Sequence, residues 1–218
     1  MKKITLCAIL MLSMLGAAAQ RHYIPVLKRQ LDSILREDQK YRELFVQMMD
    51  NTKTDSLAKV LHIDPEHMAD SVNRLMVQTD TSNTRWIQKV IARYGYSGKS
   101  LVGDSSSSIA WSVLQHSNQI AAYLSVVKKA ASKGELDKTY AALMEDRVLM
   151  YAKKPQIYGT QGGYKKFKSG KSENIIYPIQ DPAGVNERRR KAGFKTTVEE
   201  NAKRLGINYR VVTMDELQ

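Results

Sequence analysis

Apolar residues recur every three or four positions along most of the chain, which is the spacing of helices that bury one face. The first such stretch covers residues 25–50 and starts at Pro25, a residue that suits the first turn of a helix. Its apolar stripe consists of Leu27, Leu31, Ile34, Leu35, Tyr41, Phe45 and Met48 or Met49. The pattern therefore predicts a long first helix with one side turned towards a core.

Residues that cap or end helices divide the rest of the helical pattern. The further helices that we expect span residues 64–77, 83–95, 107–131, 137–152, 181–193 and 197–206. The first of these starts at Asp64 followed by Pro65, and the last starts at the capping box Thr197-x-x-Glu200. Asn83 is a candidate cap for the helix over residues 83–95.

Residues 155–180 interrupt this pattern with four glycines and several lysines. A loop of this length in a compact domain is often functional or mobile. Residues 208–213 could form a short strand without an evident partner. The fold class that we expect is all-α, a single multi-helix domain over residues 20–218, with an irregular loop at 155–180 and short C-terminal helices over 181–206.

The first 19 residues predict a cleavable signal peptide. Lys2 and Lys3 precede an uncharged, mostly apolar stretch that ends in Ala17-Ala18-Ala19, small residues that suit a signal peptidase. The apolar stretch is shorter than the roughly 20 residues of a membrane-spanning helix. Cleavage after Ala19 would leave no transmembrane anchor and would remove Cys7, the only cysteine. We therefore expect a periplasmic or secreted protein.

The chain is strongly basic, with a formal net charge of +12. Without Lys2 and Lys3 it has 32 basic and 22 acidic residues, a net charge of about +10 that favours anionic partners. An exported protein with few aromatic residues is not expected to bind nucleic acid. The densest basic run, residues 188–191, is predicted to be a solvated helix face rather than a binding patch.

Several signals for common chemistries fail on inspection. Gly98-Lys99-Ser100 and Gly170-Lys171-Ser172 resemble the end of a phosphate-binding loop, but Arg93 and Lys165 stand where that motif needs its first glycine. His62 and His67 do not have the spacing of metal ligands on a helix. We therefore expect no metal site and no cofactor.

Three polar residues stand at core-facing positions of three predicted helices, namely Asp38, His116 and Arg147. A buried group without a partner costs several kcal/mol, so we expect these residues to contact one another or to line a polar cavity. The short link between the helices over 107–131 and 137–152 places His116 and Arg147 within about 8 Å of the same level.

The chain then leaves this helix pair at the His116 end with hydrogen-bonding residues, Gln156, Tyr158, Thr160 and Gln161. One interpretation is a buried structural ion-pair network with this segment as a polar turn. The leading functional interpretation is a pocket that binds a small polar or anionic ligand, with Arg147 holding an anion. A metal-independent enzyme with His116 as general acid or base is an alternative, in which Gln156, Tyr158 and Gln161 orient the substrate. An envelope protein with a structural or partner-binding role is the other alternative.

An ordered series of short motifs resembles an uncharacterised bacterial family of the domain-of-unknown-function kind. The motifs are Tyr94-Gly95-Tyr96-Ser97-Gly98-Lys99-Ser100-Leu101-Val102-Gly103, Ala110-Trp111, Gln115-His116-Ser117, Glu145-Asp146-Arg147, Pro155-Gln156-Ile157-Tyr158-Gly159-Thr160-Gln161 and Tyr177-Pro178-Ile179-Gln180-Asp181-Pro182. Asp38-Gln39 with Arg42 is similar to the opening helix of that family. The resemblance covers roughly residues 25–210 and implies relatives without an established activity. It adds Gln39, Arg42, Gln115 and Asp146 to the candidate ligand-binding residues.

Overall fold

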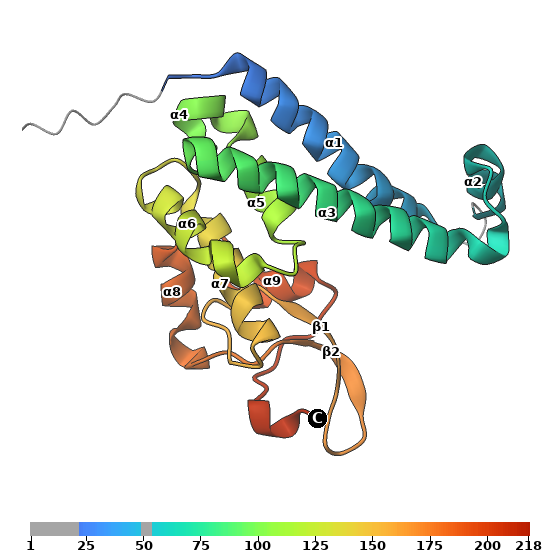
Figure 1. Ribbon diagram of the computed structural model, residues 1–218. Helices are drawn as coiled ribbons and strands as arrows, with labels where there is room; N and C mark the ends of the chain where they lie inside the picture. Colours follow the sequence, from blue (N-terminus) through green and yellow to red (C-terminus); the bar gives the residue numbers. More distant parts are fainter. Residues whose placement is uncertain (1–21, 49–53) are drawn as a thin grey trace, which may run out of the picture.

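Two long helices, α1 (Pro25–Met48) and α3 (Met68–Tyr94), lie antiparallel and side by side along one side of the protein (Figure 1). The computed structural model describes residues 22–48 and 54–218. Helix α1 begins at Pro25, as the sequence pattern predicts, and buries Leu27 and Leu31. The apolar side of α1 thus packs against the rest of the protein, and Asp38 lies on that side.

Residues 64–95 form one long helix after a short turn, and not the two helices that the caps predict. The 3₁₀ helix η1 (Pro65–His67) is capped by Asp64, whose carboxylate accepts a hydrogen bond from the Glu66 N–H at 3.0 Å. Asn83, the expected cap, is buried inside α3. Packing along α1 outweighs the local preference of asparagine for a helix end.

Three short elements pack around this helix pair. Helix α2 (Thr54–Leu61), which the sequence pattern did not predict, packs against α1 and η1. Helix α4 (Lys99–Val102) and the 3₁₀ helix η2 (Asp104–Ser106) pack against α1.

The prediction of one continuous helix over residues 107–131 is wrong. The chain forms α5 (Ile109–Leu114) and α6 (Ile120–Ser132), separated by residues 115–119. At the break, the carbonyl of Leu114 accepts both the N–H of Ser117, at 3.1 Å, and its hydroxyl, at 2.9 Å. This tighter turn ends α5, because a serine hydroxyl competes with the backbone for helical hydrogen bonds.

Helix α7 (Lys138–Tyr151) packs along α6, as the short link between them predicts. It begins after Asp137, whose carboxylate accepts the Thr139 N–H at 2.8 Å. The main core lies between these helices and α1, α3 and α5, and includes Ile87, Ile109, Val113, Leu114, Val127 and Met144.

The segment over residues 155–180, expected to be an irregular loop, contains an antiparallel hairpin. Strand β1 (Gly162–Lys166) pairs with β2 (Ser172–Ile176) in a register that sets Gly162 opposite Ile176. The glycines that argued against a helix serve the hairpin instead: a side chain at Gly162 would meet Ile207 and the Ile175 carbonyl.

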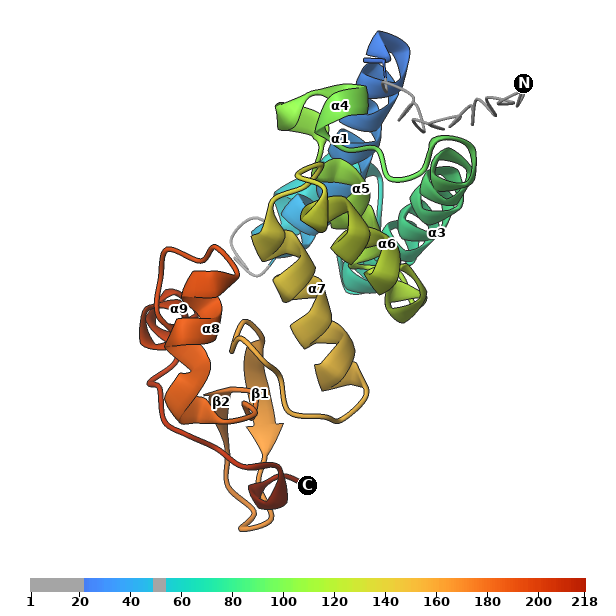
Figure 2. The same ribbon diagram turned by 90° about the vertical axis from the view of Figure 1, so that its left-hand side faces the viewer.

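Short helices follow the hairpin, as predicted. The 3₁₀ helix η3 (Pro182–Gly184), α8 (Val185–Lys191), α9 (Val198–Arg204) and the 3₁₀ helix η4 (Met214–Glu216) pack with the hairpin beside α7 (Figure 2). The capping box of Thr197 and Glu200 is confirmed at the start of α9. Residues 208–213 form no strand, and the hairpin meets the C-terminus through a bridge between Phe167 and Leu217.

The protein is thus mostly helical and forms a single domain with one small sheet. Among residues 22–48 and 54–218, no helix has the length and apolar character needed to cross a membrane. The predicted signal peptide, residues 1–19, lies outside the described residues.

Candidate functional site

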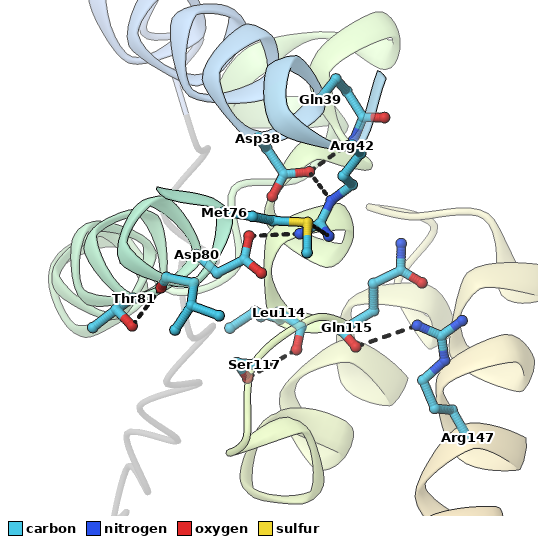
Figure 3. Close-up of polar contacts among 11 residues, drawn as sticks. Asp38, Gln39, Arg42, Met76, Asp80, Thr81, Leu114, Gln115, Ser117 and Arg147 are labelled. Atoms are coloured by element: carbon cyan, nitrogen blue, oxygen red, sulfur yellow. Dashed lines mark hydrogen bonds and ion pairs between the residues drawn. The ribbon is translucent and has the colours of Figure 1, made fainter. Parts of the chain in front are cut away.

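Arg42 on α1 crosses to α3 and connects two carboxylates (Figure 3). Its Nη2 lies 2.5 Å from Oδ1 of Asp80, and its Nε lies 3.5 Å from Oδ2 of Asp38. Its Nη1 also contacts the sulfur of Met76 at 3.4 Å. Asp38 is only 1% exposed, so the sequence expectation that it faces the core is confirmed.

Asp38 also accepts a hydrogen bond from its neighbour Gln39, whose Nε2 lies 2.7 Å from Oδ2. Its partners therefore come from α1 itself, and the cation that compensates it is Arg42 rather than Arg147. This part of the candidate site matches the interpretation as a buried ion-pair network.

His116 lies in the segment between α5 and α6, where it is half-buried, and not in the middle of a helical face. Burial lowers the pKa of His116 to about 4, with a further lowering by Arg42 and Arg147 against an opposing effect of Asp80. The imidazole is therefore neutral at pH 7. These three charges lie within electrostatic reach of the same imidazole, on α1, α7 and α3.

Arg147 on α7 is half-buried and has only neutral partners. Its Nε donates to Oε1 of Gln161 at 3.1 Å. Its Nη1 donates to the carbonyl of Gln115 at 3.3 Å (Figure 3). No carboxylate in the described part of the chain lies within ion-pair distance of this guanidinium. Burial lowers the pKa of Arg147, and the positive charge of Arg42 contributes to this lowering.

Asp146, the neighbour of Arg147 on α7, is fully buried and supports the loop that follows the helix. Its carboxylate accepts backbone N–H groups of Ile157 at 2.7 Å, Tyr158 at 3.0 Å and Thr160 at 3.0 Å. Burial raises the pKa of Asp146 in spite of these hydrogen bonds, which lower it. The role that this geometry gives Asp146 is to hold the backbone of the loop.

Gln156 is buried and closes the same loop. Its Nε2 donates to the carbonyls of Gln161 at 2.9 Å and Tyr177 at 2.6 Å, and its Oε1 accepts the N–H of Gln161 at 2.9 Å. Thr160 is buried too, and its hydroxyl accepts from Gln161 Nε2 at 2.9 Å. Gln156 and Thr160 therefore position Gln161, which is the loop residue that reaches Arg147.

Tyr158 is half-buried and its ring lies beside Phe194, with 6.2 Å between the ring centroids. Burial raises the pKa of its hydroxyl, with additional effects of Glu145 and Asp146. Its side chain is not among those that contact Arg147, and it thus belongs to the wall of the loop rather than to the group around His116.

The basic run at residues 188–191 is only partly a solvated face, and the prediction is wrong for its first two arginines. Arg189 is 2% exposed and donates to the carbonyls of Tyr158 and Thr196, each at 2.8 Å. Arg188 donates to the carbonyl of Ile157 at 3.0 Å. These arginines donate to loop carbonyls that have no partner in a helix or a strand. The run of basic residues in the sequence does not by itself indicate this role.

The structure thus divides the predicted residues into two groups. The α1 side consists of Asp38, Gln39 and Arg42. The α7 side consists of Gln115, His116, Arg147 and Gln161. Asp80 joins the first group and was missed, because the expected gap between two helices at residues 77–83 placed it in a turn. In the continuous helix α3, Asp80 follows Met76 by four residues, so both side chains lie on the helix face that Arg42 contacts.

A sequence model of a family of unknown function (DUF6624) matches residues 38–212, so the chain belongs to that family. The matched range contains every candidate residue described above, and the expected membership of an uncharacterised family is confirmed. Neither the curated proteins nor the solved structures include a match.

Proposed function

We propose that this member of a family of unknown function binds a small anionic ligand at Arg147 and His116, outside the cytoplasm. The observation that carries the proposal is the half-buried guanidinium of Arg147, which has two neutral oxygen acceptors and no carboxylate partner in the described residues. A partly desolvated charge of this kind is costly unless an opposite charge compensates it.

Arg147 has donor capacity left for such a ligand. A guanidinium carries five N–H donors in a planar fork, and the contacts to Gln161 and Gln115 engage one on Nε and one on Nη1. The remaining donors suit a carboxylate or phosphate group, which arginine binds through two parallel hydrogen bonds. The neutral His116 adds a group that becomes protonated more easily once an anion is near.

A comparison within the chain supports a ligand role for Arg147 rather than a structural one. Arg42 is similarly half-buried, and it is paired with both Asp38 and Asp80. The buried Arg189 has neutral partners only, but all three of its nitrogens donate within the fold. Arg147 differs from both, because it has no carboxylate partner and its Nη2 makes no hydrogen bond within the described residues.

An enzyme that uses His116 as general base is the second candidate. It has less support, because a pKa of about 4 makes the imidazole a weak base at pH 7, whereas a general base works best with a pKa near the pH at which it acts. A role in partner binding through residues 188–191 has less support, because Arg188 and Arg189 are engaged within the fold.

Anion titrations with a matched pair of variants test the binding proposal. Acetate, phosphate and sulfate at pH 7 are added to wild type, Arg147→Gln and Arg190→Gln, and the melting temperature is measured at constant ionic strength. Arg190 is exposed on α8, so Arg190→Gln removes the same charge elsewhere. We expect at least one anion to stabilise wild type and Arg190→Gln but not Arg147→Gln, since a ligand stabilises the state that binds it. Equal stabilisation of all three proteins would contradict the proposal.

A further inference from the structure

The two sides of the candidate site carry opposite net charge. On the side of α1 and α3, the carboxylates of Asp38 and Asp80 face a single guanidinium, that of Arg42. Formal charges on this side therefore add to one negative charge. The pairing therefore leaves the two carboxylates only partly compensated.

On the side of α7, the positive charge of Arg147 is left over. Glu145, two residues before it, pairs with Lys128 on α6 at 2.5 Å. The buried Asp146 accepts backbone N–H groups of the loop, and the positive charge within its electrostatic reach is that of Arg189. His116, between the two sides, is neutral because burial disfavours its protonated form. Neither carboxylate pairs with Arg147, whose positive charge is left without an ion-pair partner in the described residues.

Asp80 is the accessible carboxylate of the α1–α3 side. Its side chain is 19% exposed, whereas that of Asp38 is completely buried. One oxygen, Oδ1, accepts from Arg42, and Figure 3 shows the other oxygen turned away from Arg42, towards the Leu114–Gln115 segment. No hydrogen bond to this second oxygen occurs within the described residues.

Gln115 lies between the two charges. Its carbonyl is the acceptor for Arg147, and its side-chain amide extends into the space between Arg42 and Arg147 in Figure 3. Within the part of the chain that the structure describes, this amide has no hydrogen-bond partner. An amide offers both a donor and an acceptor, so it can serve a ligand at either charged end.

We infer that the ligand of this site is a zwitterion of the amino-acid or short-peptide class, with its carboxylate on Arg147 and its ammonium group on Asp80. The inference rests on the anion binding proposed above and adds the second charge to it. A single free carboxylate oxygen suits the hydrogen bond of an ammonium group, because a divalent cation such as Ca²⁺ requires six or more oxygen ligands. A charge-assisted hydrogen bond at each end gives selectivity over ligands with one charge.

A ladder of ω-amino acids tests this inference and measures the separation of the two charges. Binding of glycine, β-alanine, 4-aminobutyrate and 6-aminohexanoate is measured by calorimetry at pH 7. Acetate, propionate, butyrate and hexanoate serve as the matched carboxylates, and the corresponding alkylamines as the matched cations. We expect at least one ω-amino acid to bind about tenfold or more tightly than its matched carboxylate, as one added charge-assisted hydrogen bond predicts.

Substitutions assign the two ends of the ligand. Asp80→Asn is expected to remove the preference for the amino acid, whereas Asp80→Glu, which keeps a carboxylate at this position, is expected to retain it. Asp70→Asn makes the same change at an exposed position of α3 and leaves binding unchanged. Arg147→Gln weakens the binding of the amino acid and of its matched carboxylate to the same extent. Circular dichroism confirms that each variant is folded.

The outcomes separate the inference from the proposed function. If carboxylates bind through Arg147 and an added ammonium group does not increase the affinity, the zwitterion inference is wrong and the proposed anion binding stands. A preference that survives Asp80→Asn would also overturn it. Absence of binding by both carboxylates and amino acids would overturn the zwitterion. The proposed function would fail as well only if phosphate and sulfate also had no effect through Arg147.

Discussion

Arg147 donates from Nε to Oε1 of Gln161, 3.1 Å away, across the junction between α7 and the loop that follows it. The side chain of Gln161 is held in place from its other end, since Nε2 donates to the hydroxyl of Thr160 at 2.9 Å. A neutral amide therefore orients this guanidinium without cancelling its charge. That combination is what an anion site needs and what a structural ion pair does not use.

Gln161→Glu should abolish the anion response while Arg147 stays in place. The new carboxylate would pair with the guanidinium and compete directly with an added anion. The measurement is the change in melting temperature with acetate, phosphate and sulfate, as for wild type. Gln161→Leu is the matched control, because it removes the amide and leaves the guanidinium uncompensated. We expect Gln161→Leu to keep a measurable anion response, and a response of Gln161→Glu as large as that of wild type would contradict the prediction.

His116 should make the protein less stable as the pH falls from about 6.5 to about 4. The folded-state pKa of about 4 lies below the ordinary value of 6.5, so in this window the unfolded chain binds more protons than the folded one. The loss amounts to about 2 kcal/mol, a value reduced because the imidazole is partly exposed. Urea unfolding at several pH values, with His116→Asn as the comparison, measures this slope. The variant should lack this part of the pH dependence.

The same histidine links the pH to ligand binding. An anion beside the imidazole favours its protonated form, so a bound anion should raise the pKa of His116. Anion affinity should therefore increase as the pH falls from 7 to 5. Titration of the imidazole by NMR, with and without saturating sulfate, measures both effects. A pKa near 6.5 in the ligand-free protein would show that burial does not act as described.

The hydrophobic pattern predicted the helical elements well where a helix carries its own start signal in the sequence. It predicted α1, α7 and the capping box of α9 because their signals are local. It failed at Asn83 and at Ser117, two polar residues with opposite outcomes. Packing against α1 keeps α3 helical at Asn83, whereas the hydroxyl of Ser117 helps to end α5. The sequence alone does not show whether packing or the local hydrogen bond determines the structure at such a residue.

The candidate site was only partly predictable for the same reason. The positions of Asp38 and Arg147 on core-facing stripes follow from helical spacing, but their partners depend on tertiary packing. Asp38 pairs with Arg42 on its own helix, and Asp80 enters the site from α3. The structural roles of Asp146 and Arg189 also depend on the path of a loop that has no periodic pattern to predict it.

Asp146→Asn should destabilise the protein by about 2 kcal/mol. Asparagine keeps one acceptor for the N–H groups of Ile157 and Tyr158, but it places a donor where the carboxylate accepts from Thr160. Burial raises the pKa of Asp146, so removal of the charge also removes a desolvation cost, which offsets part of the loss of the hydrogen bonds.

Asp137→Asn is the control on the same helix. Asp137 caps α7, and asparagine is nearly as good a cap, so the free energy of unfolding should be almost unchanged. Denaturant unfolding of both variants gives the comparison. Equal effects of the two substitutions would contradict the assignment of Asp146 to the support of the loop.

Arg189→Ala and Arg190→Ala should differ strongly although the two arginines are adjacent. Arg189 donates to the carbonyls of Tyr158 and Thr196 and lies over the ring of Phe194, with the guanidinium carbon 4.5 Å from the ring centroid. Its removal leaves two carbonyls without a donor and opens a space in the fold, for a loss of about 3 kcal/mol. Arg190 is exposed, and its removal should change the free energy of unfolding by about 0.5 kcal/mol or less.

Because Arg189 holds the loop that positions Gln161, Arg189→Ala should also weaken the anion response, whereas Arg190→Ala should leave it intact. Denaturant unfolding and anion titration of the same two variants test both statements, and an equal loss in both variants would show that the run acts through its charge alone.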